Sequence, residues 1–115
     1  MKITIYQIRL EDDRHHLAFM GWSHFQKRGH EQPPANLYQT VYTYRKWKEK
    51  PEEVFRRFNV SYPRGYTGRS LSVSDVVELK KIFRHSKFFF CDIFGFAEVS
   101  FDKSIAIKMG PEGSV

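Results

Sequence analysis

The segment 2–10, KITIYQIRL, most constrains how this chain can fold, because it carries apolar side chains on both faces of a strand. A strand has a two-residue period, so successive side chains point to opposite faces. The two faces carry Ile3, Ile5 and Gln7 on one side and Thr4, Tyr6 and Ile8 on the other. β-branched residues favour extended backbone. We therefore expect a strand in the middle of a sheet, with other parts of the chain covering both faces.

Further strands and two short helices are expected around this central strand. The richness of segment 37–44 in Tyr, Thr and Val makes it the clearest second strand. The other expected strands are 76–83, 87–93 and 96–101, with a short one at 15–20. The expected helices are 21–28, which Gly29 would end, and 51–59, which Pro51, Glu52 and Glu53 would begin.

Strands dominate this pattern, and no regular strand–helix–strand alternation occurs, which favours an α+β fold. The chain has 115 residues, enough for one core. We predict a single small domain of residues 1–108 with a twisted, largely antiparallel sheet of about five strands and two short helices. Residues 109–115, MGPEGSV, are expected to form a flexible tail.

The positive net charge and the high aromatic content favour an anionic partner. The chain has 19 Lys and Arg against 13 Asp and Glu, a formal net charge of +6, and 17% aromatic residues. Cations meet phosphates and rings stack on bases, so this combination suits nucleic-acid binding. The alternative is a solvated basic surface around a Phe-rich core. The single cysteine excludes an internal disulfide, and no apolar run reaches the roughly 20 residues that cross a bilayer. We expect a cytoplasmic protein without a membrane partner.

The sequence contains residue types that can act in catalysis, but their spacing does not predict that they come together in a catalytic or metal site. His15 and His16 are adjacent and would point to opposite faces of a strand, so one metal ion cannot bind both. Asp75 and Glu78 do not have the spacing of a metal-dependent nuclease, because they too would lie on opposite faces. Three alternate serines near them lack a Gly-x-Ser-x-Gly context. Cys91 lies in the apolar run FFFCDIF, where a thiol is usually a small core residue. We expect no enzymatic activity, no catalytic residue, no metal and no cofactor.

Basic and aromatic residues instead cluster around Trp47, and a second basic cluster lies at 80–87, from the end of the strand predicted at 76–83 onward. They would form one continuous positive face if the sheet brings them together. The predicted binding residues are Arg45, Lys46, Trp47, Lys48, Arg56, Arg57, Tyr62, Arg64, Tyr66, Arg69, Lys80, Lys81 and Arg84. Such a face could equally dock an acidic protein. In a further alternative, the long basic side chains only cover hydrophobic edges.

The segment 62–79, YPRGYTGRSLSVSDVVEL, combines hydroxyls, guanidinium groups and rings in one loop. Its Ser-Val-Ser-Asp portion is suited to turning the chain sharply into a strand, with side chains that cap free backbone N–H groups. The residues expected in the core are Leu71, Val73 and Val76, and those left outside are Arg64, Tyr66 and Arg69. The loop is therefore either a scaffold or a contact surface.

Several segments together resemble the YodL-like domain, over about residues 3–99. They are ITIYQI near the start, VY at 41–42, PEEVFRRFNVSYPRGYTGRSLSVSDVVEL and FFFCDIFGFAEV. The most specific positions are Phe58-Asn59, Pro63, Tyr66 and GRSLSVSDVVEL, and Gly95, Phe96 and Val99 fit a terminal GF-x-x-V pattern.

This resemblance implies an origin in Firmicutes or their mobile genetic elements, and it supplies no catalytic residues. It implies a non-enzymatic inhibitor or adaptor that binds a host protein or ribonucleoprotein. One such role is anti-defence, of the anti-CRISPR type, acting on an effector nuclease or its guide RNA. The alternatives are a regulatory protein that binds RNA or DNA directly, and an inhibitor of a host cytoskeletal or cell-envelope protein. The oligomeric state stays open.

Overall fold

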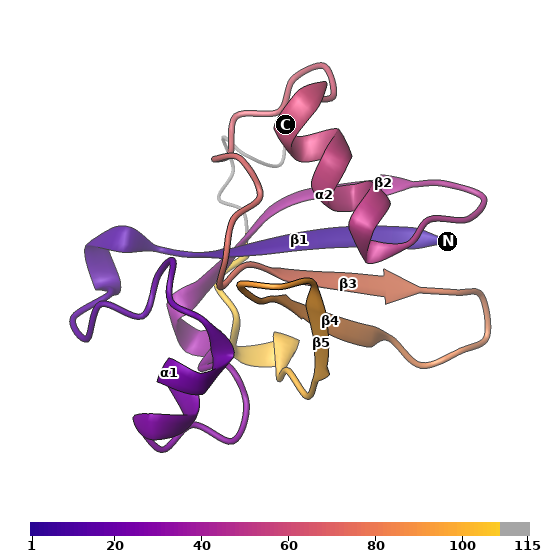
Figure 1. Ribbon diagram of the computed structural model, residues 1–115. Helices are drawn as coiled ribbons and strands as arrows, with labels where there is room; N and C mark the ends of the chain where they lie inside the picture. Colours follow the sequence, from indigo (N-terminus) through magenta and orange to yellow (C-terminus); the bar gives the residue numbers. More distant parts are fainter. Residues whose placement is uncertain (109–115) are drawn as a thin grey trace.

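The computed structural model describes residues 1–108 and contains one five-stranded sheet (Figure 1). The strands are β1 (Lys2–Ile8), β2 (Tyr38–Arg45), β3 (Val76–Lys80), β4 (Lys87–Cys91) and β5 (Phe96–Val99). Their order is β2-β1-β3-β4-β5, and every neighbouring pair is antiparallel. β1 has a strand on each side, as its two apolar faces predict. The predicted α+β fold with two short helices is confirmed.

Each face of the sheet has its own hydrophobic core and its own helix. Helix α2 (Pro51–Val60) buries Val54 and Phe58 on the face that carries Ile3 and Ile5. Helix α1 (Trp22–Lys27) buries Phe25 in the core on the opposite face. Figure 1 shows the two helices on opposite sides of the sheet. Because α1 has only six residues, it covers its face incompletely, and this leaves room for a pocket described below.

Local sequence signals mark one end of each helix. Pro51 occupies the first turn of α2, where a missing N–H costs nothing. The Glu53 carboxylate in the same turn accepts a hydrogen bond from the Lys50 N–H at 3.0 Å. Gly29 follows α1 with a φ of +86°, a left-handed conformation that glycine adopts without strain.

Some predicted strand boundaries were wrong. Segment 15–20 is a loop, because His16 and Phe19 have positive φ values of 54° and 71°, which no strand accepts. The Asp13 carboxylate holds this loop by accepting hydrogen bonds from two of its N–H groups. β3 ends at Lys80 and β4 at Cys91, earlier than expected, because tight turns follow them. The remaining elements are the 3-10 turns Leu10–Asp12, Ala35–Leu37 and Lys103–Ile105. The predicted tail 109–115 lies outside the described residues.

The serine-rich loop between α2 and β3 is internally bonded and serves as a scaffold. The Asp75 carboxylate accepts hydrogen bonds from the Ser72 N–H at 2.9 Å and from the Gln7 side chain at 3.0 Å. The Ser74 hydroxyl accepts from the Phe19 N–H at 2.9 Å. These bonds tie the loop to β1 and to the 15–20 segment. The predicted anchors Leu71 and Val76 are fully buried, whereas Val73 is only partly buried.

A β-bulge in β2 sets which of its side chains face the open part of the sheet. The register between β1 and β2 shifts by one residue between Ile5 and Tyr6, so that Val41 has no partner on β1. Thr40 and Thr43 would lie on opposite faces of a regular strand, because they are three residues apart. The extra residue brings both threonines to the same face.

Candidate nucleic-acid interface

One end of the sheet gathers cations from three separate parts of the chain, and we call it the basic end. It comprises Lys2, the segment 45–50 and the segment 80–87. Figure 1 shows the start of β1, the β2–α2 connection and the β3–β4 hairpin at the same end of the sheet. The basic end carries nine of the nineteen Lys and Arg residues: Lys2, Arg45, Lys46, Lys48, Lys50, Lys80, Lys81, Arg84 and Lys87. Segments far apart in sequence therefore form one positive surface.

Three of these cations form a row across three strands. Lys2 is the register partner of Arg45 on β2 and of Lys80 on β3. Residues directly opposite each other in an antiparallel pair project from the same face about 5 Å apart. None of the three has a carboxylate partner within residues 1–108. Like charges in such positions are destabilising, so the row is an electrostatic cost that an anionic ligand would relieve.

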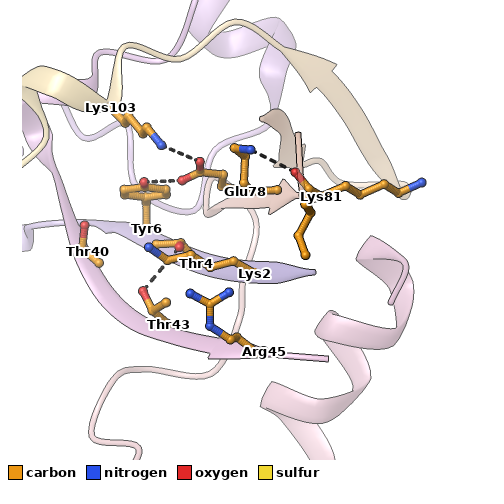
Figure 2. A pocket seen from close by; sticks show the side chains of 11 residues that line it. Lys2, Thr4, Tyr6, Thr40, Thr43, Arg45, Glu78, Lys81 and Lys103 are labelled. Atoms are coloured by element: carbon orange, nitrogen blue, oxygen red, sulfur yellow. Dashed lines mark hydrogen bonds and ion pairs between the residues drawn. The ribbon is translucent and has the colours of Figure 1, made fainter. Parts of the chain in front are cut away.

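The row lines part of a pocket of about 410 Å³ on the face that α1 leaves open, which we call the sheet pocket (Figure 2). Its cations are Lys2, Arg45, Lys80, Lys81 and Lys103, and its hydroxyl side chains are Thr4, Thr40, Thr43 and Tyr6. The Glu78 carboxylate also lines it. Figure 2 shows the Lys81 ammonium pointing away from the pocket, while Lys80 donates to the Lys81 backbone carbonyl at 2.9 Å.

The Glu78 carboxylate is fully occupied by neighbours and leaves the rest of the pocket positive. It accepts hydrogen bonds from Tyr6 at 2.6 Å and from Lys103 at 2.8 Å, and a third from Ser86. Burial raises the pKa of Glu78, but the bonds from Lys103, Ser86 and Tyr6 outweigh burial and lower that pKa below its ordinary value. Glu78 is therefore an ionised wall of the pocket, already neutralised by Lys103.

The connection between β2 and α2 is held in place by Glu49, whose side chain points inward, and Trp47 in the same connection points outward. Glu49 is buried and accepts hydrogen bonds from Arg57 on α2, at 2.6 Å, and from Tyr44 on β2. The Arg57 guanidinium also lies over the Tyr44 ring, 5.6 Å from its centroid. These contacts fix the loop at one point, while the Trp47 side chain is 96% exposed.

The β3–β4 hairpin presents a second exposed ring. Phe83 is 99% exposed and has a φ of +59°. A left-handed conformation is costly for a bulky residue, and a glycine or asparagine would avoid that cost. The Phe83 ring has no role in the core and is accessible for contact with a partner. Ile82 beside it is also exposed.

An apolar groove of about 290 Å³ lies on the other face of the basic end, beside the start of α2. Its apolar lining is Met1, Pro51, Leu79 and Phe89, and its basic lining is Lys48, Lys50, Lys81, Arg84, His85 and Lys87. Glu49 also lines it, but Glu49 is engaged with Arg57. The sheet pocket and the apolar groove share Lys81.

The structure divides the predicted binding residues into three groups. Seven lie together at the basic end: Arg45, Lys46, Trp47, Lys48, Lys80, Lys81 and Arg84. Three are exposed elsewhere, on α2 or in the loop after it: Arg56, Tyr62 and Arg64. Whether these ten bind a partner stays a prediction.

The last three predicted residues serve internal contacts, so the expected outward position of Tyr66 and Arg69 was wrong. Tyr66 packs edge-on against Phe58, with ring centroids 4.8 Å apart, and its hydroxyl donates to the Arg69 carbonyl. The Arg69 guanidinium donates to the Ile8 carbonyl at 3.0 Å. Arg57 is the ion-pair partner of Glu49. Each cation or hydroxyl bonds to an acceptor within the protein, and the sequence alone does not reveal this.

Sequence reasoning missed Lys2, Phe83 and Thr43. The two-residue period identifies Lys2 only as part of a strand, and its place in the row depends on pairing with residues far away in sequence. The same period places Phe83 at the end of a strand rather than in an exposed turn. The signal that could have found it is the segment KKIFRHSK, where two apolar residues interrupt a run of cations.

The profile of the YodL-like domain matches residues 2–101 of the chain. The chain belongs to the YodL-like domain family. No curated protein matches it, and no solved structure does. The match spans both the serine-rich loop and the basic end, and the architecture described above is thus that of a YodL-like domain.

The titratable groups of this YodL-like domain are dispersed rather than convergent. Asp75 and Glu78 bond to side chains on opposite faces of the sheet, as predicted. Burial, with Asp75 and Asp92 nearby, raises the pKa of the Cys91 thiol to about 12, so the reactive thiolate is scarce. Within residues 1–108, no group of three or more His, Cys, Asp or Glu side chains is placed to hold a metal ion. No helix in that part of the chain is long and apolar enough to span a membrane.

Proposed function

We propose that this YodL-like domain is a non-enzymatic binding protein whose basic end engages single-stranded nucleic acid. The observation that carries the proposal is the row Arg45–Lys2–Lys80, three cations that strand register places side by side without a carboxylate partner in the described part of the chain. Trp47 and Phe83 are almost fully exposed, and they belong to the β2–α2 connection and the β3–β4 hairpin, which Figure 1 shows at the same end of the sheet. A positive surface with exposed rings is how proteins bind single strands, because cations follow the backbone and rings stack on bases.

A single strand suits this surface better than a duplex. The bases of a duplex are stacked on each other, so protruding rings have no free base face to contact. The helix nearest the basic end is also unsuited to the major groove, because the first turn of α2 carries Glu52 and Glu53. The two rings would each contact an unstacked base, while the lysines and arginines between them neutralise phosphates.

A second candidate partner is an acidic protein surface, and the apolar groove favours it. Apolar residues surrounded by six basic side chains suit an acidic segment with one or two apolar anchors. The inhibitor hypothesis, including an anti-defence action on an effector nuclease or its guide RNA, is compatible with either partner. The host protein or ribonucleoprotein it would block, and the cytoplasmic location, stay predictions.

The test of nucleic-acid binding compares variants that lack exposed rings at opposite ends of the sheet. Fluorescence anisotropy with a labelled single-stranded 12-mer RNA is measured for the natural protein, for Trp47→Ala combined with Phe83→Asn, and for Phe94→Asn. Phe94 is 95% exposed in the β4–β5 turn, away from the basic end, and is a matched control. Asparagine tolerates the left-handed conformation of residue 83.

The double variant should lose at least about tenfold in affinity, since base stacking on a ring contributes about 1–3 kcal/mol. Phe94→Asn should bind like the natural protein. Absence of RNA and DNA binding by the natural protein at about 50 mM salt, where electrostatic binding is strong, would refute the proposal. A partner recovered from lysate that survives nuclease treatment and is lost in Lys50→Glu/Lys87→Glu, two cations that line the apolar groove but not the sheet pocket, would favour the acidic protein instead.

A further inference from the structure

We infer that the sheet pocket is a binding site for a phosphate monoester, such as the phosphorylated end of a strand. This inference rests on the proposed nucleic-acid binding for its natural ligand, but the chemistry of the pocket is independent of it. The pocket differs from the rest of the basic end because it is lined by hydroxyl groups and bounded on one side by hydrogen-bonded side chains.

The charge of the pocket suits a dianion. Lys103 and Glu78 form an ion pair at 2.8 Å and cancel. Arg45, Lys2 and Lys80 are left without carboxylate partners within residues 1–108. A phosphate monoester carries about −1.5 to −2 charges at neutral pH, whereas a diester within a strand carries about −1. A row of three neighbouring cations therefore gains more from the monoester.

The hydroxyl groups supply the neutral hydrogen bonds that a phosphate also needs. Thr4 and Thr43 form a cross-strand pair with their Oγ1 atoms 3.3 Å apart, directly next to the cation row. Thr40 lines the same pocket because of the bulge at Val41. A phosphate has three terminal oxygens, and threonine hydroxyls and a planar guanidinium can each donate to one of them.

The closed side of the pocket favours a chain end over a continuous strand. Tyr6 and Lys103 both donate hydrogen bonds to Glu78, and the three side chains form a wall on one side of the threonines (Figure 2). Tyr6 and Glu78 are both buried, and the hydrogen bonds to Glu78 offset the cost of burying its charge. A strand that enters past Lys2 and Arg45 meets this wall, so its terminal phosphate fits while a continuing backbone would have to turn back.

The test compares 12-mer RNAs that differ only in a 5′- or 3′-phosphate with the unphosphorylated 12-mer, by fluorescence anisotropy. A second arm titrates the free nucleotide AMP, with adenosine as its uncharged counterpart, and follows the amide signals of Thr4, Thr40 and Thr43 by NMR. One phosphorylated end should bind at least about tenfold tighter than the unphosphorylated RNA, because hydrogen bonds to a charged group are about twice as strong as neutral ones.

The variants separate this site from the general basic surface. Arg45→Gln and Thr43→Val should abolish the preference for a terminal phosphate. Lys48→Gln, a neighbouring cation outside the sheet pocket, should weaken binding of all three RNAs equally and keep the preference. Saturable shifts with AMP but no preference among the RNAs would support the site with a small-molecule ligand. RNA binding without preference and without AMP shifts would overturn this inference and leave the proposed function standing. If the natural protein binds none of the RNAs but still shows saturable shifts with AMP, the phosphate site stands and the proposed function is refuted.

Discussion

At the scale of single residues, the most informative group is Asp75, whose buried carboxylate organises the serine-rich loop. Burial raises its pKa to about 7, although the bonds from Ser72 and Gln7 and the charge of Arg69 act in the opposite direction. The folded protein therefore holds a proton on Asp75 in conditions where the unfolded chain, with a pKa near 3.8, has lost it. This is a linkage between folding and pH.

The sign of that linkage makes the protein less stable as pH rises. The stabilising contribution is complete below the unfolded pKa and is lost as pH passes through the folded pKa. We predict that the free energy of unfolding falls by about 2–3 kcal/mol between pH 5 and pH 8, measured by urea denaturation at both values. Asp75→Asn, which mimics the protonated carboxyl, should remove most of this fall. A natural protein that is equally stable at both pH values would contradict the prediction.

The remaining residues of the loop show why exposure was difficult to predict at this scale. Arg57, Arg69 and Tyr66 have the composition of a contact surface, but each one makes an internal hydrogen bond, to Glu49, to the Ile8 carbonyl and to the Arg69 carbonyl respectively. The scaffold role of Leu71 and Asp75 is predictable because turn chemistry is local. Whether a polar side chain points outward depends on tertiary partners, which a single sequence does not reveal.

At the scale of elements, the cation row is expected to lower the free energy of unfolding and to strengthen the binding of RNA. Lys2 sits between Arg45 and Lys80 in the register of three strands, so its charge is repelled from both sides. We predict that Lys2→Gln raises the free energy of unfolding by about 0.5 kcal/mol at low salt and weakens binding of single-stranded RNA. Urea denaturation at about 20 mM and 500 mM NaCl checks the first part, because salt should erase the gain.

Lys87→Gln is the matched control for that experiment. Lys87 is also an exposed strand lysine at the basic end, but its register partner is the apolar Leu79. Neutralising it should leave stability unchanged at both salt concentrations. If both substitutions shift stability equally, net charge rather than the cation row is responsible.

The elements themselves were largely predictable, whereas the site they build was not. Local sequence patterns predict β1 and α2. For β1 the pattern is the two-residue period of KITIYQI, and for α2 it is the Pro-Glu-Glu start of PEEVFRRFNV. The row and the sheet pocket depend on register between strands separated by some forty or eighty positions, and on a bulge at Val41 that no glycine or proline marks. Periodicity predicts that a strand exists, but it does not predict which residue lies opposite Lys2.

At the scale of the whole molecule, the position of charge matters more than its total. Nine of nineteen Lys and Arg residues lie at the basic end, while α1 at the other end carries Lys27 and is followed by Arg28. Long-range attraction depends on net charge, but contact with phosphates depends on where the cations are. Two variants of equal net charge can therefore separate attraction from contact.

We predict that Lys46→Glu/Lys48→Glu and Lys27→Glu/Arg28→Glu differ strongly, although each lowers the net charge of +6 by four. Binding of a single-stranded RNA is measured by anisotropy across a series of salt concentrations. The plot of log affinity against log salt should become shallower by about 1.4 in the first variant, since each lost phosphate contact on a single strand removes about 0.7. The second variant should keep the natural slope, because its charges do not touch the strand. Equal slopes in the two variants would mean that the overall field holds the RNA, without phosphate contacts from Lys46 and Lys48 at the basic end.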